Sequence, residues 1–139
     1  MENARIFDYE HATCDTLAGI YVEASDETAN PPDQVQKHAL ESDTVLVDNT
    51  PPRIEGLTLT VRRLRARIID GTSPIARVEV AVDGRPSFWP LAAADGVFDT
   101  VSEAVDADVS ALISSGSHIV VVRAFDAAGN SVAQDVEAK

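Results

Sequence analysis

Alternating apolar and polar positions dominate the second half of the chain. In residues 77–82, valine recurs at every second position, and this run ends at an Asp-Gly pair, which is typical of tight turns. Residues 63–68 alternate in the same way. Because successive side chains on a strand point to opposite faces, each run predicts a strand with one buried face. Residues 119–124 are nearly all apolar, which predicts a central strand buried on both sides.

Turn signals recur about every 8–12 residues, which is typical of an all-β sandwich of about 100 residues. One stretch allows two interpretations. Val101, Val105 and Val109 fall at helical spacing, whereas the alternative is a strand over residues 104–109 followed by a turn. We favour the strand, because a sandwich needs one in this part of the chain.

The joint at residues 48–52, Asp-Asn-Thr-Pro-Pro, is the clearest boundary in the chain. Its two prolines fix φ and remove two backbone donors, so neither a helix nor a central strand passes through it. Consecutive prolines also make a stiff, extended connection. We therefore expect a division into residues 1–49 and residues 50–139, of which the second is long enough for one complete sandwich.

An internal repeat links the two parts. Residues 22–30 match residues 122–130 at a constant offset of 100 residues, with Val, Ala, Asp and Asn coinciding. Because this offset is about one domain length, residues 1–49 are interpreted as the C-terminal strands of a truncated preceding copy.

Two motifs carry a resemblance to a known group of domains. The sequence VDNTPP at residues 47–52 and the sequence AFDAAGN at residues 124–130 resemble the opening joint and the last turn of fibronectin type III-like or immunoglobulin-like repeats in large bacterial exported proteins. Residues 89–103 are similar to an insertion found in versions beside β-propeller-like domains. The resemblance covers residues 47–139 well and residues 17–47 in part, where the glycine of the last turn is missing.

The resemblance implies an all-β fold, an immunoglobulin/fibronectin III-like two-sheet Greek-key sandwich preceded by a partial copy of the same fold. It also implies a secreted, periplasmic or cell-surface location. Gly129 would take a positive φ in the last hairpin, and His118 would lie where such folds bond a corner tyrosine to the backbone. The implied strands begin near Ile54, Leu64, Arg77, Phe88, Ala104, His118 and Ser131.

The charge balance argues against some partners. The formal net charge is −12, from 23 acidic and 11 basic residues, and a field of this sign repels phosphate backbones and anionic lipid. No apolar run reaches the roughly 18 residues of a membrane span, and no signal peptide follows Met1. We therefore expect no nucleic-acid partner and no membrane insertion. The arginines between residues 62 and 67 are expected on an outer sheet face, paired with carboxylates such as Glu79.

Known catalytic signatures are missing from the sequence. The histidines His11, His38 and His118 are far apart and share no ligand spacing. The single cysteine, Cys14, has only His11 near it in sequence and is expected to be an ordinary thiol. The serines just before His118 are expected to point mostly away from it, and the acidic residues between positions 95 and 108 are explained by a solvated loop. We therefore expect no enzyme and no catalytic residue, with calcium as the one cofactor to consider.

Five polar residues form the one candidate binding site. In the implied topology, the joint, the loop after the second strand and the last hairpin share one end of the sandwich. Carboxylates on turns, together with backbone carbonyls, can supply the roughly six to eight oxygens that calcium prefers. The competing explanation is that aspartate and asparagine occur there because they form turns. The candidate calcium ligands are Asp48, Asn49, Asp70, Asp126 and Asn130.

The sequence favours a non-catalytic structural module, either a spacer or a protein-interaction module of a larger extracellular bacterial protein. The alternative is a calcium-stiffened adhesion or carbohydrate-binding module. Its only candidate stacking residues are Phe88, Trp89 and Phe98, and a small sandwich is expected to bury them. The expected partners are neighbouring domains of the parent protein. Because a truncated copy exposes apolar faces, residues 1–45 are expected to fold onto the second domain or to form a homodimer.

Overall fold

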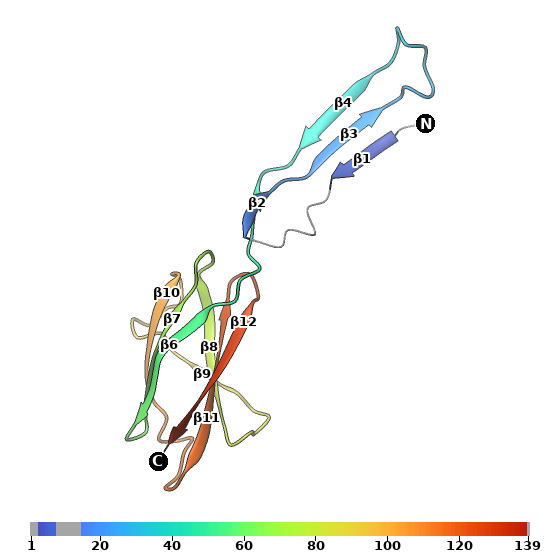
Figure 1. Cartoon of the computed structure of the whole chain (residues 1–139). Helices are drawn as coiled ribbons and strands as arrows, with labels where there is room; N and C mark the ends of the chain where they lie inside the picture. Colours follow the sequence, from blue (N-terminus) through green and yellow to red (C-terminus); the bar gives the residue numbers. More distant parts are fainter. Residues whose placement is uncertain (1–2, 8–14, 139) are drawn as a thin grey trace. The chain divides into compact units, whose positions relative to one another are not determined.

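The computed structural model describes residues 3–7 and 15–138, and these residues form strands and turns but no helix. The chain divides into two compact units, Met1–Val47 and Asp48–Lys139, which are called the first and the second unit (Figure 1). All strand pairs are antiparallel. The predicted all-β class is therefore confirmed. Cys14 and His11 lie outside the described residues.

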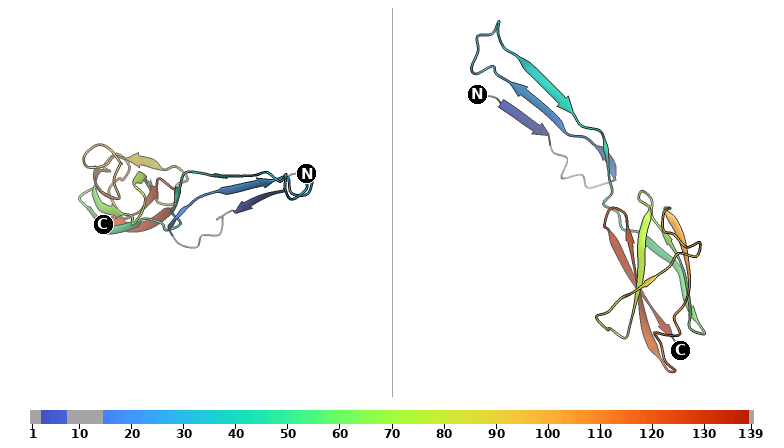
Figure 2. Two further views of the ribbon diagram at one scale, coloured as in Figure 1. Left: turned by 90° about the horizontal axis from the view of Figure 1, so that it is seen from above. Right: turned by 180° about the vertical axis from the view of Figure 1, so that it is seen from behind.

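The second unit consists of two antiparallel sheets. One sheet has the order β10-β7-β6, and the other has the order β12-β11-β8-β9. Figure 2 shows this unit from behind, with β11 and β12 on one side and β7 and β10 on the other. The strands of the first sheet are β6 (Arg53–Thr60), β7 (Arg63–Ile69) and β10 (Ser102–Asp108). Those of the second sheet are β8 (Ile75–Val82), β9 (Trp89–Leu91), β11 (His118–Asp126) and β12 (Ser131–Ala138).

The core of the second unit lies between its two sheets. Alternate residues of β7 are buried, as the alternating pattern predicts, and in β8 the alternating valines Val78, Val80 and Val82 are buried together with Ala81. The strand β11 corrects one expectation, because only its alternate residues are buried and Ile119 remains 54% exposed. In a two-layer sandwich each sheet packs one face against the other sheet, so even a central strand leaves one face toward solvent. The largest fully buried core side chains are Leu64, Ile68, Ile75, Val78, Val80, Val82, Val105, Val109, Val120 and Val122.

The segment that allowed two interpretations is a strand, β10. Val105 and Val109 are buried, whereas Val101 is 42% exposed, so these valines do not share one helical face. The β10 residues pair with β7, from Ser102 opposite Ile69 to the other end of both strands. The predicted strand is therefore confirmed.

The first unit forms two small sheets. In one sheet, β3 (Tyr21–Ser25) lies between β1 (Asn3–Phe7) and β4 (Lys37–Glu41). In the other, β2 (Thr16–Ala18) pairs with β5 (Val45–Val47). Within the described residues of both units, no helix is long and apolar enough to cross a membrane.

Candidate functional site

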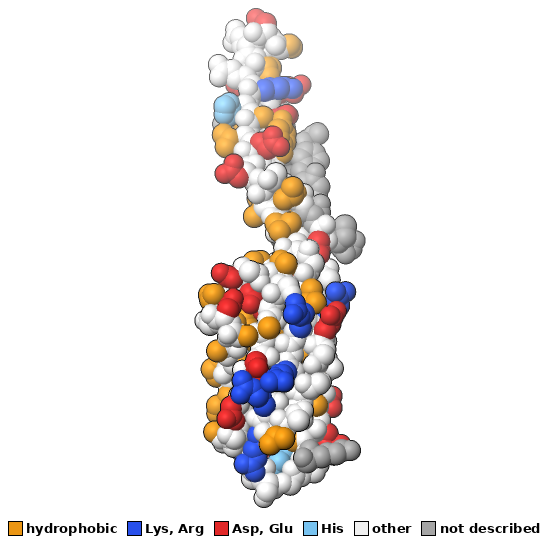
Figure 3. Space-filling model, turned by 90° about the vertical axis from the view of Figure 1, so that its left-hand side faces the viewer, with side chains coloured by type: hydrophobic (Ala, Val, Ile, Leu, Met, Phe, Trp, Pro, Cys, Tyr) orange, Lys and Arg blue, Asp and Glu red, His pale blue; other side chains and the backbone are white. Residues whose placement is uncertain are grey.

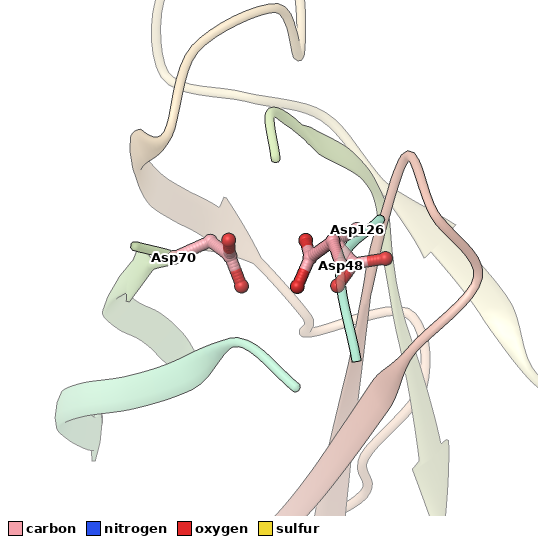
Figure 4. A group of neighbouring side chains, drawn as sticks. All are labelled: Asp48, Asp70 and Asp126. Carbon is pink, nitrogen blue, oxygen red and sulfur yellow. The ribbon is translucent and has the colours of Figure 1, made fainter. Parts of the chain in front are cut away.

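Three aspartates converge at one end of the second unit (Figure 4). Asp48 precedes β6, Asp70 follows β7 and Asp126 ends β11. One carboxylate oxygen from each lies within 4.8 Å of the others. The three residues are only 8%, 5% and 2% exposed, respectively. The sequence had predicted all three as ligands of one site, and the structure brings them together.

The strand pairing explains why these aspartates meet. Arg53, at the start of β6, pairs with Ile69 at the end of β7, so the joint that leads into β6 and the residue after β7 share one end of their sheet. In the other sheet, Asp126 pairs with Ile75 at the start of β8. A short loop connects the end of β7 to the start of β8, so the end of β11, which pairs with the start of β8, lies near the end of β7.

Each of the first two carboxylates uses one oxygen to form its own turn. Oδ1 of Asp48 accepts a hydrogen bond from the Thr50 amide at 3.0 Å. Oδ1 of Asp70 accepts from the amides of Thr72 and Ser73, both at 2.7 Å. The remaining oxygens, Oδ2 of Asp48 and Oδ2 of Asp70, are fully buried and have no hydrogen-bond partner. Turn formation therefore accounts for only half of each carboxylate.

Asn130 fastens the third aspartate and the joint together. Its amide nitrogen Nδ2 donates to Oδ2 of Asp126 at 2.9 Å and to the main-chain carbonyl of Asp48 at 3.0 Å. Its backbone amide donates to Oδ1 of Asp126, also at 2.9 Å. Asn130 therefore contacts the site as a donor, while Asn49 is exposed on the surface. Gly129, which precedes Asn130, has a φ of 94°, as predicted for the last hairpin.

The hydrogen bond from an asparagine side chain to an aspartate four residues before it, which we call the Asp–Asn clasp, also occurs in the first unit. Nδ2 of Asn30 donates to Oδ2 of Asp26 at 2.5 Å, which matches the bond between Asn130 and Asp126 one hundred residues later. The other oxygen of Asp26 accepts from the Gln36 amide at 2.7 Å. Among the described residues, the aspartates of the second unit form the one group of three metal-ligating side chains. The sequence repeat is thus also a repeat of side-chain hydrogen bonding.

No basic side chain within the described residues forms an ion pair with the three carboxylates of Asp48, Asp70 and Asp126. Buried carboxylates repel one another and lose hydration, so they need a proton, a donor or a cation to offset that cost. Asn130 and the backbone amides supply donors for some of the oxygens, but not for all of them.

A second cluster lies at the opposite end of β11, and the sequence did not predict it. Ser114 Oγ lies 3.1 Å from Nε2 of His118, and Nδ1 of His118 lies 2.7 Å from Oδ2 of Asp83. Oδ1 of Asp83 also accepts from the Ile119 amide at 3.0 Å. The hydrogen bond from His118 is the main cause that lowers the pKa of Asp83. One of the three serines, Ser114, thus contacts the histidine ring because the loop before β11 folds it back, whereas Ser117 bonds to Glu137. The ring of His118 bonds to the side chains of Ser114 and Asp83, whereas the resemblance implied a bond to backbone.

The order serine, histidine, aspartate is the order of hydrogen bonds in serine hydrolases. Ser114, however, is exposed. Electrostatic interactions are weak in water, so the histidine–aspartate pair would do little to activate the Ser114 hydroxyl there. The cluster instead ties together the loop before β11, the start of β11 and the turn after β8.

The arginine pairing differs from the prediction. Arg63 and Arg65 pair with Asp106 of the neighbouring strand β10, whereas Glu79 pairs with Arg123 and Arg77. The reason is that Glu79 belongs to β8, which lies in the other sheet from β7. Figure 3 shows basic side chains beside acidic ones on a face of the second unit. Arg63 and Arg65 are therefore balanced locally by Asp106, as on an ordinary outer sheet face.

The aromatic side chains are mostly part of the packing. Trp89 and Phe98 are partly buried against the core. Phe88 lies under the guanidinium of Arg123, at 4.0 Å from the ring centroid. The prediction that these rings pack into the core therefore holds for Trp89 and Phe98, but not for Phe88, which packs against the Arg123 guanidinium outside the core cluster.

Comparison of the chain with protein-family models, with curated proteins and with solved structures finds no match.

Proposed function

We propose that this chain is a non-catalytic structural module of a larger exported protein. In this proposal the second unit is a fibronectin type III-like sandwich that acts as a spacer. Its three-stranded sheet facing a four-stranded sheet supports this topology, as does the joint that the sequence resemblance covers. Neighbouring domains of the parent protein are the proposed partners.

One observation carries the proposed role: the side chain of Asn130 holds the main-chain carbonyl of Asp48. The last hairpin of the sandwich is thereby hydrogen-bonded to the residue at which the chain enters the sandwich. Pro52, four residues further along, is fully buried, and the Asp48 side chain bonds to the Thr50 amide. A spacer holds its neighbours at a defined position only if the chain enters and leaves it in fixed directions. These contacts hold the entering chain, residues 48–52, against the second unit.

Removal of the Asn130 side chain tests this role. Asn130→Ala should increase the hydrogen exchange rate of the Thr50 amide about fivefold, since a net hydrogen bond is worth about 1 kcal/mol. Exchange of single amides can be followed by NMR. The matched control is Asn30→Ala, which removes the equivalent clasp in the first unit and should leave Thr50 unchanged. Fast exchange of Thr50 in the wild-type protein, at the rate of an unprotected loop, would contradict a fixed joint.

A further inference from the structure

We propose that Asp48, Asp70 and Asp126 bind one calcium ion. This inference rests on the proposed structural role and gives it a ligand: the ion joins the start of β6, the end of β7 and the end of β11, and so links both sheets where the chain enters the sandwich. The three carboxylates carry a formal charge of about −3, which no basic side chain among the described residues offsets.

The unpartnered oxygens are the observation that points to a ligand. Oδ2 of Asp48 and Oδ2 of Asp70 are buried, yet neither accepts a hydrogen bond. Figure 4 shows the Asp70 side chain extending toward the other two aspartates. If the aspartates served only as turn formers, their second oxygens would be expected to reach solvent, as those of exposed aspartates do.

The spacing of the carboxylate oxygens suits one cation. Oxygens around a calcium ion bind at about 2.3–2.6 Å, so oxygens on opposite sides of it lie about 4.6–5.2 Å apart. One carboxylate oxygen from each aspartate lies within 4.8 Å of the other two, which is close enough for a single ion to contact all three.

The donor set selects the class of metal. All three side-chain ligands are carboxylates, without the histidine or cysteine that zinc and copper prefer. Hard oxygen ligands suit calcium and magnesium, and turns with irregular geometry suit calcium better because magnesium demands near-ideal octahedral coordination. Asn130 is a positioning residue in this site, since its Nδ2 donates to Asp126 and cannot bind a cation through that atom.

The test uses the full chain, stripped of metal with a chelator and kept at constant salt to suppress weak binding to its acidic surface. Isothermal titration calorimetry with calcium chloride should show one site per chain, and magnesium should bind at least about tenfold more weakly. A thermal melt should shift upward by several degrees in excess calcium. No binding heat and no shift would overturn the proposal, and tighter binding of magnesium would overturn its assignment to calcium.

Asp70→Asn separates a ligand from a turn former. The asparagine keeps the oxygen that accepts from Thr72 and Ser73 but loses one negative charge. Calcium should then raise the melting temperature little or not at all, while the metal-free variant should melt no lower than the metal-free wild type, because repulsion is relieved. Asp26→Asn, in the clasp of the first unit, is the matched control and should keep the full calcium response. A full response in Asp70→Asn would place the ion elsewhere and overturn the site.

The two proposals can fail separately. If metal-free protein protects the Thr50 amide through Asn130 and calcium has no effect, the spacer role stands without a metal. If calcium binds but Thr50 exchanges freely in both states, the metal site stands and the fixed joint fails.

Discussion

Glu103 is buried although it belongs to an acidic stretch of the chain. The residue is 4% exposed, and its Oε1 accepts hydrogen bonds from the amides of Asp99 and Thr100 at 3.0 and 2.7 Å. The Thr100 hydroxyl donates to the same oxygen at 2.8 Å. The amide of Asp99 is the largest of the causes that lower the pKa of Glu103. The expectation that this stretch is a solvated loop is therefore wrong at Glu103, because β10 turns that side chain inward to hold the preceding loop.

The lowered pKa predicts a pH dependence. Because the folded pKa lies below the unfolded value of about 4.3, these bonds stabilise the fold at neutral pH, and their contribution is lost as the pH falls through the folded pKa. Glu103→Gln should lower the free energy of unfolding by about 1–2 kcal/mol near neutral pH, and the difference should shrink on acidification. Urea unfolding at a series of pH values measures it. The exposed control Asp135→Asn should change stability by less than about 0.5 kcal/mol, and a pH-independent loss in Glu103→Gln would refute the explanation.

The predictability of the aspartate cluster and of the histidine cluster differs for a physical reason. Asp48, Asp70 and Asp126 each lie at a turn near a strand end, so the topology that the family resemblance implies could place them together. The contact of His118 with Asp83 depends instead on the register of β11 against β8 and on the loop that returns Ser114. No local pattern contains that register.

The hairpin between β6 and β7 turns on two residues that rarely form such turns. Val61 and Arg62 have φ angles of 48° and 65°, the combination found in type I′ turns. Asparagine and glycine are favoured there, and a β-branched residue at positive φ is strained. The carbonyl of Arg62 accepts from the Val109 amide at 2.9 Å, which ties this turn to the end of β10. The sequence therefore indicates the two strands through their alternation, but it gives no sign of the turn between them.

Relief of this strain should stabilise the protein. The double substitution Val61→Asn with Arg62→Gly should raise the free energy of unfolding by about 1–2 kcal/mol, because both new residues tolerate positive φ. Val61 is 93% exposed, so no packing is lost. Val61→Thr remains β-branched and serves as the control that should give no gain. Equal stability of the double variant and the wild type in urea would show that the turn is not strained.

The two units differ in how completely they bury their apolar side chains. The core cluster belongs entirely to the second unit. In the described part of the first unit, large apolar side chains remain exposed: Leu17, Ile20, Tyr21, Leu40, Val45 and Leu46. This contrast fits the interpretation of the first unit as a partial copy, which stays a prediction because the sequence repeat covers only residues 22–30.

Exposed apolar residues of this kind predict self-association through the first unit. Sedimentation velocity at high micromolar concentration should show a dimer, and Leu40→Ser together with Leu46→Ser should shift it toward the monomer. The control pair Val97→Ser and Val101→Ser removes comparably exposed residues of the second unit and should leave association unchanged. A wild-type monomer whose residues 1–45 are rapidly cleaved by protease would contradict the prediction.

The position of the Asn130 clasp has a mechanical consequence. The second unit begins at the end of the sandwich that holds Asp126, and its last strand finishes at the other end, where Ala138 pairs with His118. A pull on the two ends of this unit would therefore run along β6 and β12 and load their ladders in shear, with many hydrogen bonds resisting at once. The bond between Asn130 and Asp48 lies ahead of the β6 ladder, so it would take up load before any rung of the sheet.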